Sequence, residues 1–368
     1  MPPITGLRIA AIETAGGIGD RLGFAAASLS SKEFTQVTPT RRLKEPMPAS
    51  KDGISQTPHA SIAAAQVAIL MCTKDGAAFL AEQLQSIADQ THTNWILVVS
   101  DDGSTDATRK ILSDFADSHA QKTVVRNGPG KGVCANFLSL ATDPTIDADY
   151  FAFSDQDDIW YKDKLARALT WLATVPADVP ALYCGRTELV SDDGRPYGLS
   201  PLFSRPIAFR NAIIQSLGGG NTMAFNKAAK RLLEQTGKLE VVLHDWWMYQ
   251  LVSAVGGAIR YDPQPALKYR QHLDNLIGSN RGWRARIVRL RMMLSGRFSD
   301  WNEMNIAALQ RVPAVLIKPQ NSATLQLFAR ARTASLFKRI YYLIQSGVYR
   351  QTLLGNIGLF AATVLKRI

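Results

Sequence analysis

Three carboxylates follow an apolar run in the middle of the chain, and their spacing suggests metal chemistry. The aromatic and small residues of 151–153 are typical of a buried strand, and Asp155, Asp157 and Asp158 come soon after it. Neighbouring acids repel one another, so a partly buried cluster needs a cation or hydrogen-bond donors. Hard divalent cations such as Mg²⁺ and Mn²⁺ take oxygen ligands and often share them with a diphosphate. The alternative is a solvated turn whose acids precede a helix over 162–172.

A second acidic turn ends another short apolar run. Trp95–Ser100 is followed by Asp101, Asp102 and then a Gly-Ser-Thr-Asp turn. Local structure explains part of this pattern, because the glycine suits a tight turn and the serine or threonine can cap the helix that follows. Capping does not require both Asp101 and Asp102, however. In an open α/β sheet, ligands bind in the crevice at the carboxyl ends of the strands, where both acidic turns would fall.

Strands and helices predicted around these turns place them within a longer series of motifs. A first strand is predicted over Val67–Thr73, and an amphipathic segment over Phe79–Gln90. The motifs of the series are, in order, Thr73-Lys74-Asp75-Gly76, Gln83-Leu84-Gln85-Ser86-Ile87, Gln90-Thr91, Asp101–Asp106, Asp155–Asp158, Gly218–Asn226, His244-Asp245-Trp246-Trp247 and Tyr269-Arg270-Gln271-His272 with Asn275. Their joint order and spacing resembles inverting glycosyltransferases of family 2, in particular the rhamnosyltransferase-like group of bacterial polysaccharide synthesis. The family usually has Tyr-Asn where this chain has Lys74-Asp75.

The resemblance implies both a fold and a reaction. The fold is the α/β GT-A nucleotide-diphospho-sugar transferase fold, a mixed central sheet flanked by helices, here with a C-terminal helical extension. The alternation of predicted strands and helices fits such an α/β arrangement. The reaction is the transfer of a sugar, with rhamnose as the first candidate, from a nucleotide-diphosphate donor to a saccharide or lipid-linked saccharide acceptor. A single displacement inverts the anomeric centre.

The resemblance also assigns roles to individual residues. Asp157 matches the metal-ligating acid, and Asp155 the first acid of the DXD element, which contacts the sugar or ribose. Asp102 matches the acid that hydrogen-bonds the nucleoside base, and Thr73 belongs to the nucleotide site. Mg²⁺ or Mn²⁺ would stabilise the departing diphosphate. Asp245 matches the general base, which must lie within hydrogen-bond reach of the acceptor hydroxyl.

For other residues the alternatives stay open. A helix N-terminus with a favourable acid and two core tryptophans would also explain 244–247. His272 could be a second metal ligand, a diphosphate donor or a satisfied polar side chain. Lys131, between two glycines, could approach phosphate or be an ordinary surface lysine. The residues expected on the acceptor side are Gly219, Gly220, Asn221, Trp246 and Trp247.

Positive charge gathers at the C-terminal end. Residues 281–368 hold 15 Lys and Arg against only Asp300 and Glu303, a net charge of +13. Because the whole chain carries +11, the first 280 residues carry −2. The segment Trp283–Leu294 mixes arginine with bulky apolar residues, which suits an anionic membrane surface. A helical bundle that packs on the catalytic domain is the alternative, and both can hold at once. The apolar run 352–365 is too short to span a bilayer.

These features predict three regions and a location. We expect a mobile leader over 1–64, a catalytic domain over 65–280 and a basic helical tail over 281–368. Three cysteines without CxxC spacing indicate a reducing compartment, and acids interrupt the one early apolar stretch that could be a signal peptide. Together with the basic tail, these features predict a cytoplasmic enzyme that binds peripherally at the inner face of the plasma membrane.

Three other interpretations compete with an active glycosyltransferase. No recognised motif supports nucleic-acid binding by the basic tail. A glycine-rich run over 17–23 has the wrong spacing for a dinucleotide site. An inactive nucleotide-sugar or polyanion-binding scaffold protein is the alternative function, and the retained acids at 102, 155, 157 and 245 argue against it.

Overall fold

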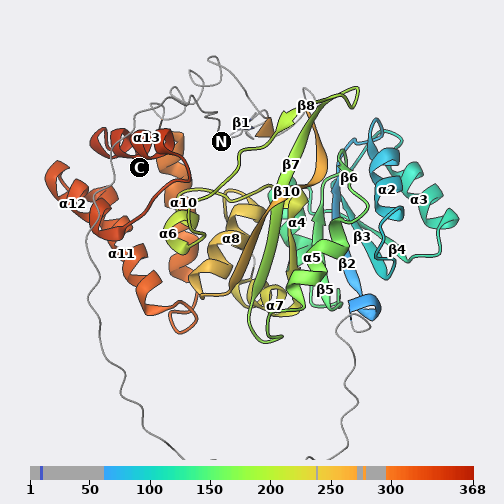
Figure 1. Ribbon diagram of the computed structural model, residues 1–368, viewed down its shortest axis with the longest axis horizontal. Coiled ribbons are helices and arrows are strands. Elements are labelled where there is room, and N and C mark those ends of the chain that lie inside the picture. The colour runs from blue at the N-terminus through green and yellow to red at the C-terminus, as the bar shows by residue number, and fades with distance from the viewer. Residues whose placement is uncertain (1–8, 11–61, 238, 272–276, 279–295) are drawn as a thin grey trace, which may run out of the picture.

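The computed structural model describes residues 9–10, 62–237, 239–271, 277–278 and 296–368 (Figure 1). The described strands are β1 (Ile9–Ala10), β2 (Val67–Thr73), β3 (Trp95–Asp101), β4 (Thr123–Asn127), β5 (Tyr150–Ser154), β6 (Ile159–Trp160), β7 (Ala181–Ser191), β8 (Pro196–Leu199), β9 (Ala224–Asn226), β10 (Ala258–Gln271) and β11 (Ile277–Gly278). The described helices are α2 (Leu80–Ala88), α3 (Thr108–Ser118), α4 (Val133–Ala141), α5 (Lys164–Leu172), α6 (Phe209–Ala212), the 3₁₀ turn η1 (Gly220–Thr222), α7 (Lys227–Thr236), α8 (His244–Ala254), α10 (Arg297–Arg311), α11 (Pro319–Thr333), α12 (Leu336–Ser346) and α13 (Leu353–Val364).

The main sheet is mixed and has the strand order β4-β3-β2-β5-β9-β7-β10-β6, with β8 paired to β7. Strands β4, β3, β2 and β5 are parallel, and so are β7 and β10. Strand β9 runs antiparallel to both β5 and β7, and β6 runs antiparallel to β10. Strands β1 and β11 form a separate parallel pair. The predicted α/β fold with a mixed central sheet flanked by helices is confirmed.

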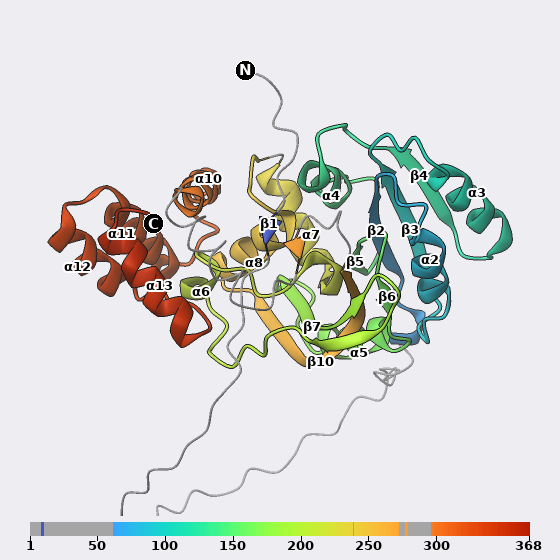
Figure 2. The same cartoon turned by 90° about the horizontal axis from the view of Figure 1, so that it is seen from above.

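The central strand β2 is buried along its whole length because helices cover both faces of the sheet. Ala68 and Leu70 belong to a core shared with α4, α7 and α8. Ile69 and Met71 point into a second core, shared with α2, α3 and α5. Figure 2 shows these helices around the sheet. The carboxyl ends of β2, β3 and β5 therefore sit on a rigid support.

The predicted strand over Val67–Thr73 is confirmed, and the alternative in which a serine or threonine of the second acidic turn caps the next helix does not hold in the structure. Helix α3 begins only at Thr108, and its first-turn amide donates a hydrogen bond to Asp106 Oδ1 at 3.0 Å. The Ser104 hydroxyl instead donates a hydrogen bond to Asp101 Oδ1. Asp101 is fully buried, so hydrogen bonds to its carboxylate are more valuable there than at an exposed helix end.

Helices α10 to α13 form the C-terminal extension at one end of the molecule (Figures 1 and 2). Leu309 of α10 and Phe328 of α11 join the core that contains α8, so this extension packs on the helices that cover the main sheet. Among the described residues, none of the helices combines the length and apolarity needed to cross a bilayer. The basic segment Trp283–Leu294 and His272 lie outside the described residues.

Candidate active site

Three loops meet where β2, β3 and β5 end. The backbone amide of Lys74 donates to Gln156 Oε1 at 2.8 Å, and Gln156 Nε2 returns a bond to the Lys74 carbonyl at 3.0 Å. Asp75 accepts from the amide of Thr105 at 2.7 Å, and its own amide donates to Ser104 Oγ at 2.9 Å. These bonds hold the two acidic turns side by side at the carboxyl edge of the sheet, as a ligand crevice in an α/β fold requires.

The acid cluster is formed by Asp155, Asp157 and Asp158. One carboxylate oxygen from each lies within 4.8 Å of the others. Asp158 is buried, whereas Asp155 and Asp157 are partly exposed. Burial, followed by the charge of Asp157, raises the pKa of both Asp155 and Asp158 well above the usual value. A hard divalent cation would relieve this repulsion, and an all-carboxylate donor set suits Mg²⁺ or Mn²⁺.

A buried lysine beside this cluster was not predicted. Lys164 is 2% exposed, and its Nζ lies 3.0 Å from the centre of the Trp160 ring. Burial lowers the pKa of Lys164, while the charges of Asp158 and Asp155 oppose that shift. Its Nζ donates to the Asn221 carbonyl at 2.6 Å, and Asn221 Nδ2 donates to Asp158 Oδ2 at 2.7 Å. Lys164 is therefore joined to Asp158 of the acid cluster through Asn221.

This network gives Asn221 a different neighbour from the one predicted. We expected its side chain on the acceptor side, but its amide is engaged by Asp158 of the acid cluster. Gly219 lies close to the other end of this amide group. A Cβ added at Gly219 would be only 2.6 Å from Asn221 Oδ1. The glycine turn thus links the cluster to α8.

Asp245 lies in the first turn of α8 and is 6% exposed. Its carboxylate accepts hydrogen bonds from the backbone amides of Gly220, at 3.1 Å, and Trp246. Burial raises the pKa of Asp245 to about 6, although both hydrogen bonds oppose the shift. The amide of Gly220 donates to Asp245, and the side chain of the next residue, Asn221, donates to Asp158, so one turn joins Asp245 to the acid cluster. A carboxylate with a pKa near 6 is suited to accept a proton at neutral pH.

His244 explains why residue 220 is glycine. Its ring stacks on Phe137 with the centroids 4.0 Å apart and meets Phe153 edge-on at 5.0 Å. Neither ring nitrogen has a hydrogen-bond partner among the described residues, and burial lowers the pKa of His244 to about 3. A Cβ added at Gly220 would overlap His244 Nε2.

We therefore expect Gly220→Ala to destabilise the protein by about 1–3 kcal/mol, because the aromatic rings leave the imidazole no room to move. Urea denaturation measures this change. Gly358→Ala is the matched control, since an added Cβ there has no heavy atom within 4 Å. Equal stability of Gly220→Ala and the parent protein would contradict this contact.

The two tryptophans after Asp245 have structural positions. Trp246 donates its indole N–H to the Ala212 carbonyl at 2.6 Å and is 6% exposed. Trp247 is 1% exposed and belongs to the main core. Trp247 therefore leaves almost no ring surface exposed in this structure, and its place on the acceptor side stays a prediction. The alternative of core tryptophans at a helix start explains Trp247.

Asp102 is held by a glycine loop. Its two carboxylate oxygens accept from the amides of Gly130, at 2.6 Å, and Gly132, at 3.0 Å. Lys131 is exposed between these glycines. Thr73 is buried, and its hydroxyl donates to Asp101 Oδ1 at 2.9 Å. The predicted nucleotide contacts of Thr73, Asp102 and Lys131 remain predictions.

The last motif contacts the acid cluster through Arg270. The Arg270 guanidinium donates to the backbone carbonyls of Asp157, at 3.2 Å, and Asp192, at 2.6 Å, and it pairs with Glu82. The charges of the acid cluster add to the burial that raises the pKa of Tyr269. The role of His272, two residues beyond Arg270, stays a prediction outside the described residues.

The fold and the site define a protein with a cluster of carboxylates at the carboxyl edge of a mixed sheet. The model of Glycosyl transferase family 2 matches residues 68–236. The chain is 30% identical to the dTDP-rhamnosyl transferase RfbG of Shigella flexneri over 235 residues, which cover 60% of this chain and 78% of that protein. It is 26% identical to the putative teichuronic acid biosynthesis glycosyltransferase TuaG of Bacillus subtilis, over 44% of this chain and 60% of that one.

Solved structures with partial likeness include two glycosyltransferases. A mannosyltransferase from Pyrobaculum calidifontis, in complex with GDP-Man and Mn²⁺, has a TM-score of 0.44 and 19% identity over 82% of this chain and 85% of that chain. The TarS protein of S. aureus, in complex with UDP-GlcNAc, has a TM-score of 0.45 and 17% identity over 77% and 93%. The sequence matches carry the assignment: the chain belongs to glycosyl transferase family 2 and has the GT-A fold predicted from its motifs.

Proposed function

We propose that this enzyme transfers a sugar from a nucleoside-diphosphate donor to a saccharide or lipid-linked saccharide acceptor, with inversion, in cell-surface polysaccharide synthesis. Its similarity to a dTDP-rhamnosyl transferase makes dTDP-rhamnose the first donor to test. The observation that carries the proposal is the closeness of two kinds of carboxylate. The acid cluster suits a diphosphate-bound cation, and Asp245, with its pKa of about 6, suits proton removal from an acceptor.

The proposed step is a single displacement. The acceptor oxygen attacks the anomeric carbon, its proton passes to Asp245, and the bond between that carbon and the diphosphate oxygen breaks. Asp157, with Asp155 and Asp158 beside it, would hold Mg²⁺ or Mn²⁺, which when bound stabilises the charge of the departing diphosphate. Asp102 would hydrogen-bond the nucleoside base. Lys164 would hold Asn221, and through it Asp158, in place beside the bound cation.

We further place the enzyme at the cytoplasmic face of the plasma membrane, where it would meet a lipid-linked acceptor. The three cysteines are free thiols, as expected in a reducing compartment. The proposed regions remain a leader over 1–64, a catalytic domain over 65–280 and a basic tail over 281–368. The membrane role predicted for Trp283–Leu294 also remains a prediction.

A donor screen tests the proposed function. We expect hydrolysis or transfer from one nucleotide sugar in a panel with Mn²⁺, with dTDP-rhamnose ahead of UDP- and GDP-sugars, and loss of this turnover with EDTA. Released nucleotide is the readout, and Asp157→Asn is the inactive control. Binding of nucleotides without turnover of any donor, even with saccharide acceptors present, would favour the scaffold alternative.

A further inference from the structure

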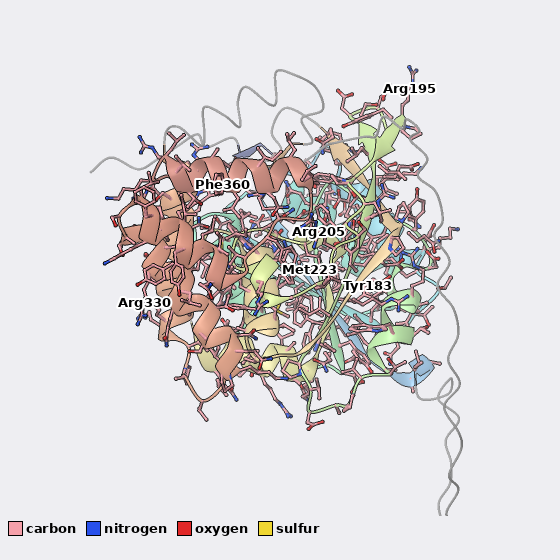
Figure 3. The ribbon with its side chains drawn as sticks, turned by 60° about the vertical axis from the view of Figure 1, so that its left-hand side comes forward. Tyr183, Arg195, Arg205, Met223, Arg330 and Phe360 are labelled. Atoms are coloured by element: carbon pink, nitrogen blue, oxygen red, sulfur yellow. The ribbon has the colours of Figure 1, made fainter. Side chains whose placement is uncertain are left out.

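Helix α13 is predominantly apolar. Between Leu353 and Val364 it has no charged residue, and yet it lies at the surface. Leu353, Ile357, Phe360 and Val364 are 71%, 57%, 49% and 41% exposed, and their spacing places them on one stripe of the helix. A surface helix of a globular domain normally presents polar residues on that side. Figure 3 labels Phe360 on this helix.

The neighbouring helix α12 has a similar outward stripe. Phe337, Tyr341 and Ile344 are 85%, 58% and 65% exposed and recur at positions i, i+4 and i+7. Helices α12 and α13 pack against each other at the end of the molecule (Figures 1 and 2). We call the two stripes together the C-terminal apolar face; it consists of Phe337, Tyr341, Ile344, Leu353, Ile357, Phe360 and Val364. Grouped exposed apolar residues of this kind mark an interaction surface.

The part of the chain that carries this face has charge of one sign. From residue 304 to residue 368 the sequence has nine Lys and Arg and no Asp or Glu. Lys338 lies in the first turn of α12, Arg350 between the two helices, and Lys366 and Arg367 directly after α13. Basic residues at the ends of an apolar helix face suit anionic headgroups. A symmetric contact between two copies would bring like charges together, so a second copy is the poorer partner.

The length of α13 decides how it would meet a lipid. Its 12 residues span about 18 Å at 1.5 Å per residue, well short of a hydrocarbon core of roughly 30 Å. Such a helix lies in the plane of the headgroup region, with its apolar stripe buried about 5–10 Å deep.

The apolar face is tied to the acceptor side of the active site. In the loop between α12 and α13, the amide of Tyr349 donates to the Arg210 carbonyl at 3.2 Å, and the amide of Gln351 donates to Gln215 Oε1 at 2.9 Å. Between those two partners, Ala212 accepts the indole N–H of Trp246, the residue after Asp245. Figure 3 labels Arg205 in the segment that leads into these contacts. Docking this face would therefore fix the Asp245 side of the crevice relative to the lipid.

We infer that the C-terminal apolar face binds the surface of an anionic membrane and presents the acceptor side of the site to lipid-linked substrate. The membrane contact rests on the face itself, and the presentation of substrate rests on the proposed function. It is a second membrane contact, separate from the one predicted for Trp283–Leu294, and that segment is kept unchanged in the test.

Vesicle flotation of the full-length protein tests the inference. The probes are phosphatidylcholine vesicles with and without phosphatidylglycerol, at low and high salt and without nucleotide sugar. The test variant is Phe337→Gln/Ile357→Gln/Phe360→Gln, and Val315→Gln is the matched control, because Val315 is 90% exposed between α10 and α11. We expect the triple variant to lose at least about tenfold in partition onto anionic vesicles, since each substitution removes apolar transfer free energy. The control should bind like the parent.

Two results would overturn the inference. One is equal flotation of the folded triple variant and the parent. The other is a parent dimer in sedimentation that the triple variant abolishes while vesicle binding is unchanged, which would make the face a contact between copies. Circular dichroism establishes that the variant is folded. The flotation assay contains no nucleotide sugar, so its result does not depend on whether the protein transfers sugar. Failure of the membrane inference can therefore be distinguished from failure of the proposed function.

Discussion

Replacing Asp245 by Asn should abolish most sugar transfer while leaving donor binding intact. Asparagine keeps the size of the side chain and an acceptor oxygen for one of the two backbone amides, that of Gly220 or that of Trp246, but it cannot take a proton from the acceptor hydroxyl. A positioned general base contributes about 10²–10⁴-fold, so we expect the transfer rate to fall within that range. Nucleotide-sugar affinity, measured by calorimetry, should change little.

The pH dependence gives this prediction a second readout. Because burial raises the pKa of Asp245 to about 6, its carboxylate gains a proton as the pH falls below that value and then cannot act as a base. The parent rate should therefore decline on the acid side of about pH 6, or at lower pH if the bound cation stabilises the carboxylate. The residual rate of the Asn variant should lack this acid limb.

Asp178→Asn is the matched control for the loss of one carboxylate, because Asp178 is exposed in the loop between α5 and β7. It should transfer sugar at the parent rate. An Asp245→Asn protein that also transfers at the parent rate, with urea stability unchanged, would remove Asp245 from the mechanism.

Replacing Asp157 by Asn should produce the opposite pattern, with loss at the donor-binding step. The backbone carbonyl of Asp157 still accepts from Arg270, so the loop keeps its anchor, but one anionic metal ligand is lost. Metal stabilisation of phosphate charge is worth several kcal/mol, and about 1.4 kcal/mol corresponds to tenfold. We expect the Mn²⁺-dependent part of nucleotide affinity to fall at least about 100-fold.

Calorimetric titration of dTDP with and without Mn²⁺ measures this effect, again beside Asp178→Asn. The comparison with Asp245→Asn is informative, because loss of the metal ligand Asp157 should weaken donor binding, whereas loss of the base Asp245 should not. If Mn²⁺ enhances dTDP binding to the Asp157→Asn protein as strongly as to the parent, the metal assignment to Asp157 is wrong.

The sequence predicted those parts of the site that follow directly from local patterns. Apolar runs located β2, β3 and β5, and the acids that follow β3 and β5 located the two acidic turns, because strand burial and turn formation depend on adjacent residues. The glycine turn and Asp245 were found through their place in the motif order. The contact between Asp245 and the Gly220 amide could not be read locally, since the two residues are 25 positions apart.

What the sequence did not reveal depends on long-range packing. Lys164 was read only as part of a helix, and nothing in its neighbours shows that it is buried beneath the acid cluster. Its bond to Asn221 spans 57 positions, and the bond from Asn221 to Asp158 spans 63. The same limit explains Trp247, whose burial depends on the core shared by α8, α4 and α7. The sequence offered one signal for a role of Lys164 at the site. This was its position as the third residue of the predicted helix over 162–172, directly after an acidic turn.

The central claim is a single displacement in which Asp245 is the base and the acid cluster holds the donor. The most direct test is NMR of the product formed by the parent enzyme with Mn²⁺, the donor found in the screen and a saccharide acceptor. The anomeric proton reports whether the configuration of the transferred sugar is inverted relative to the donor. We expect inversion at the first time point and throughout the reaction; a product that retains the donor configuration would contradict the single displacement.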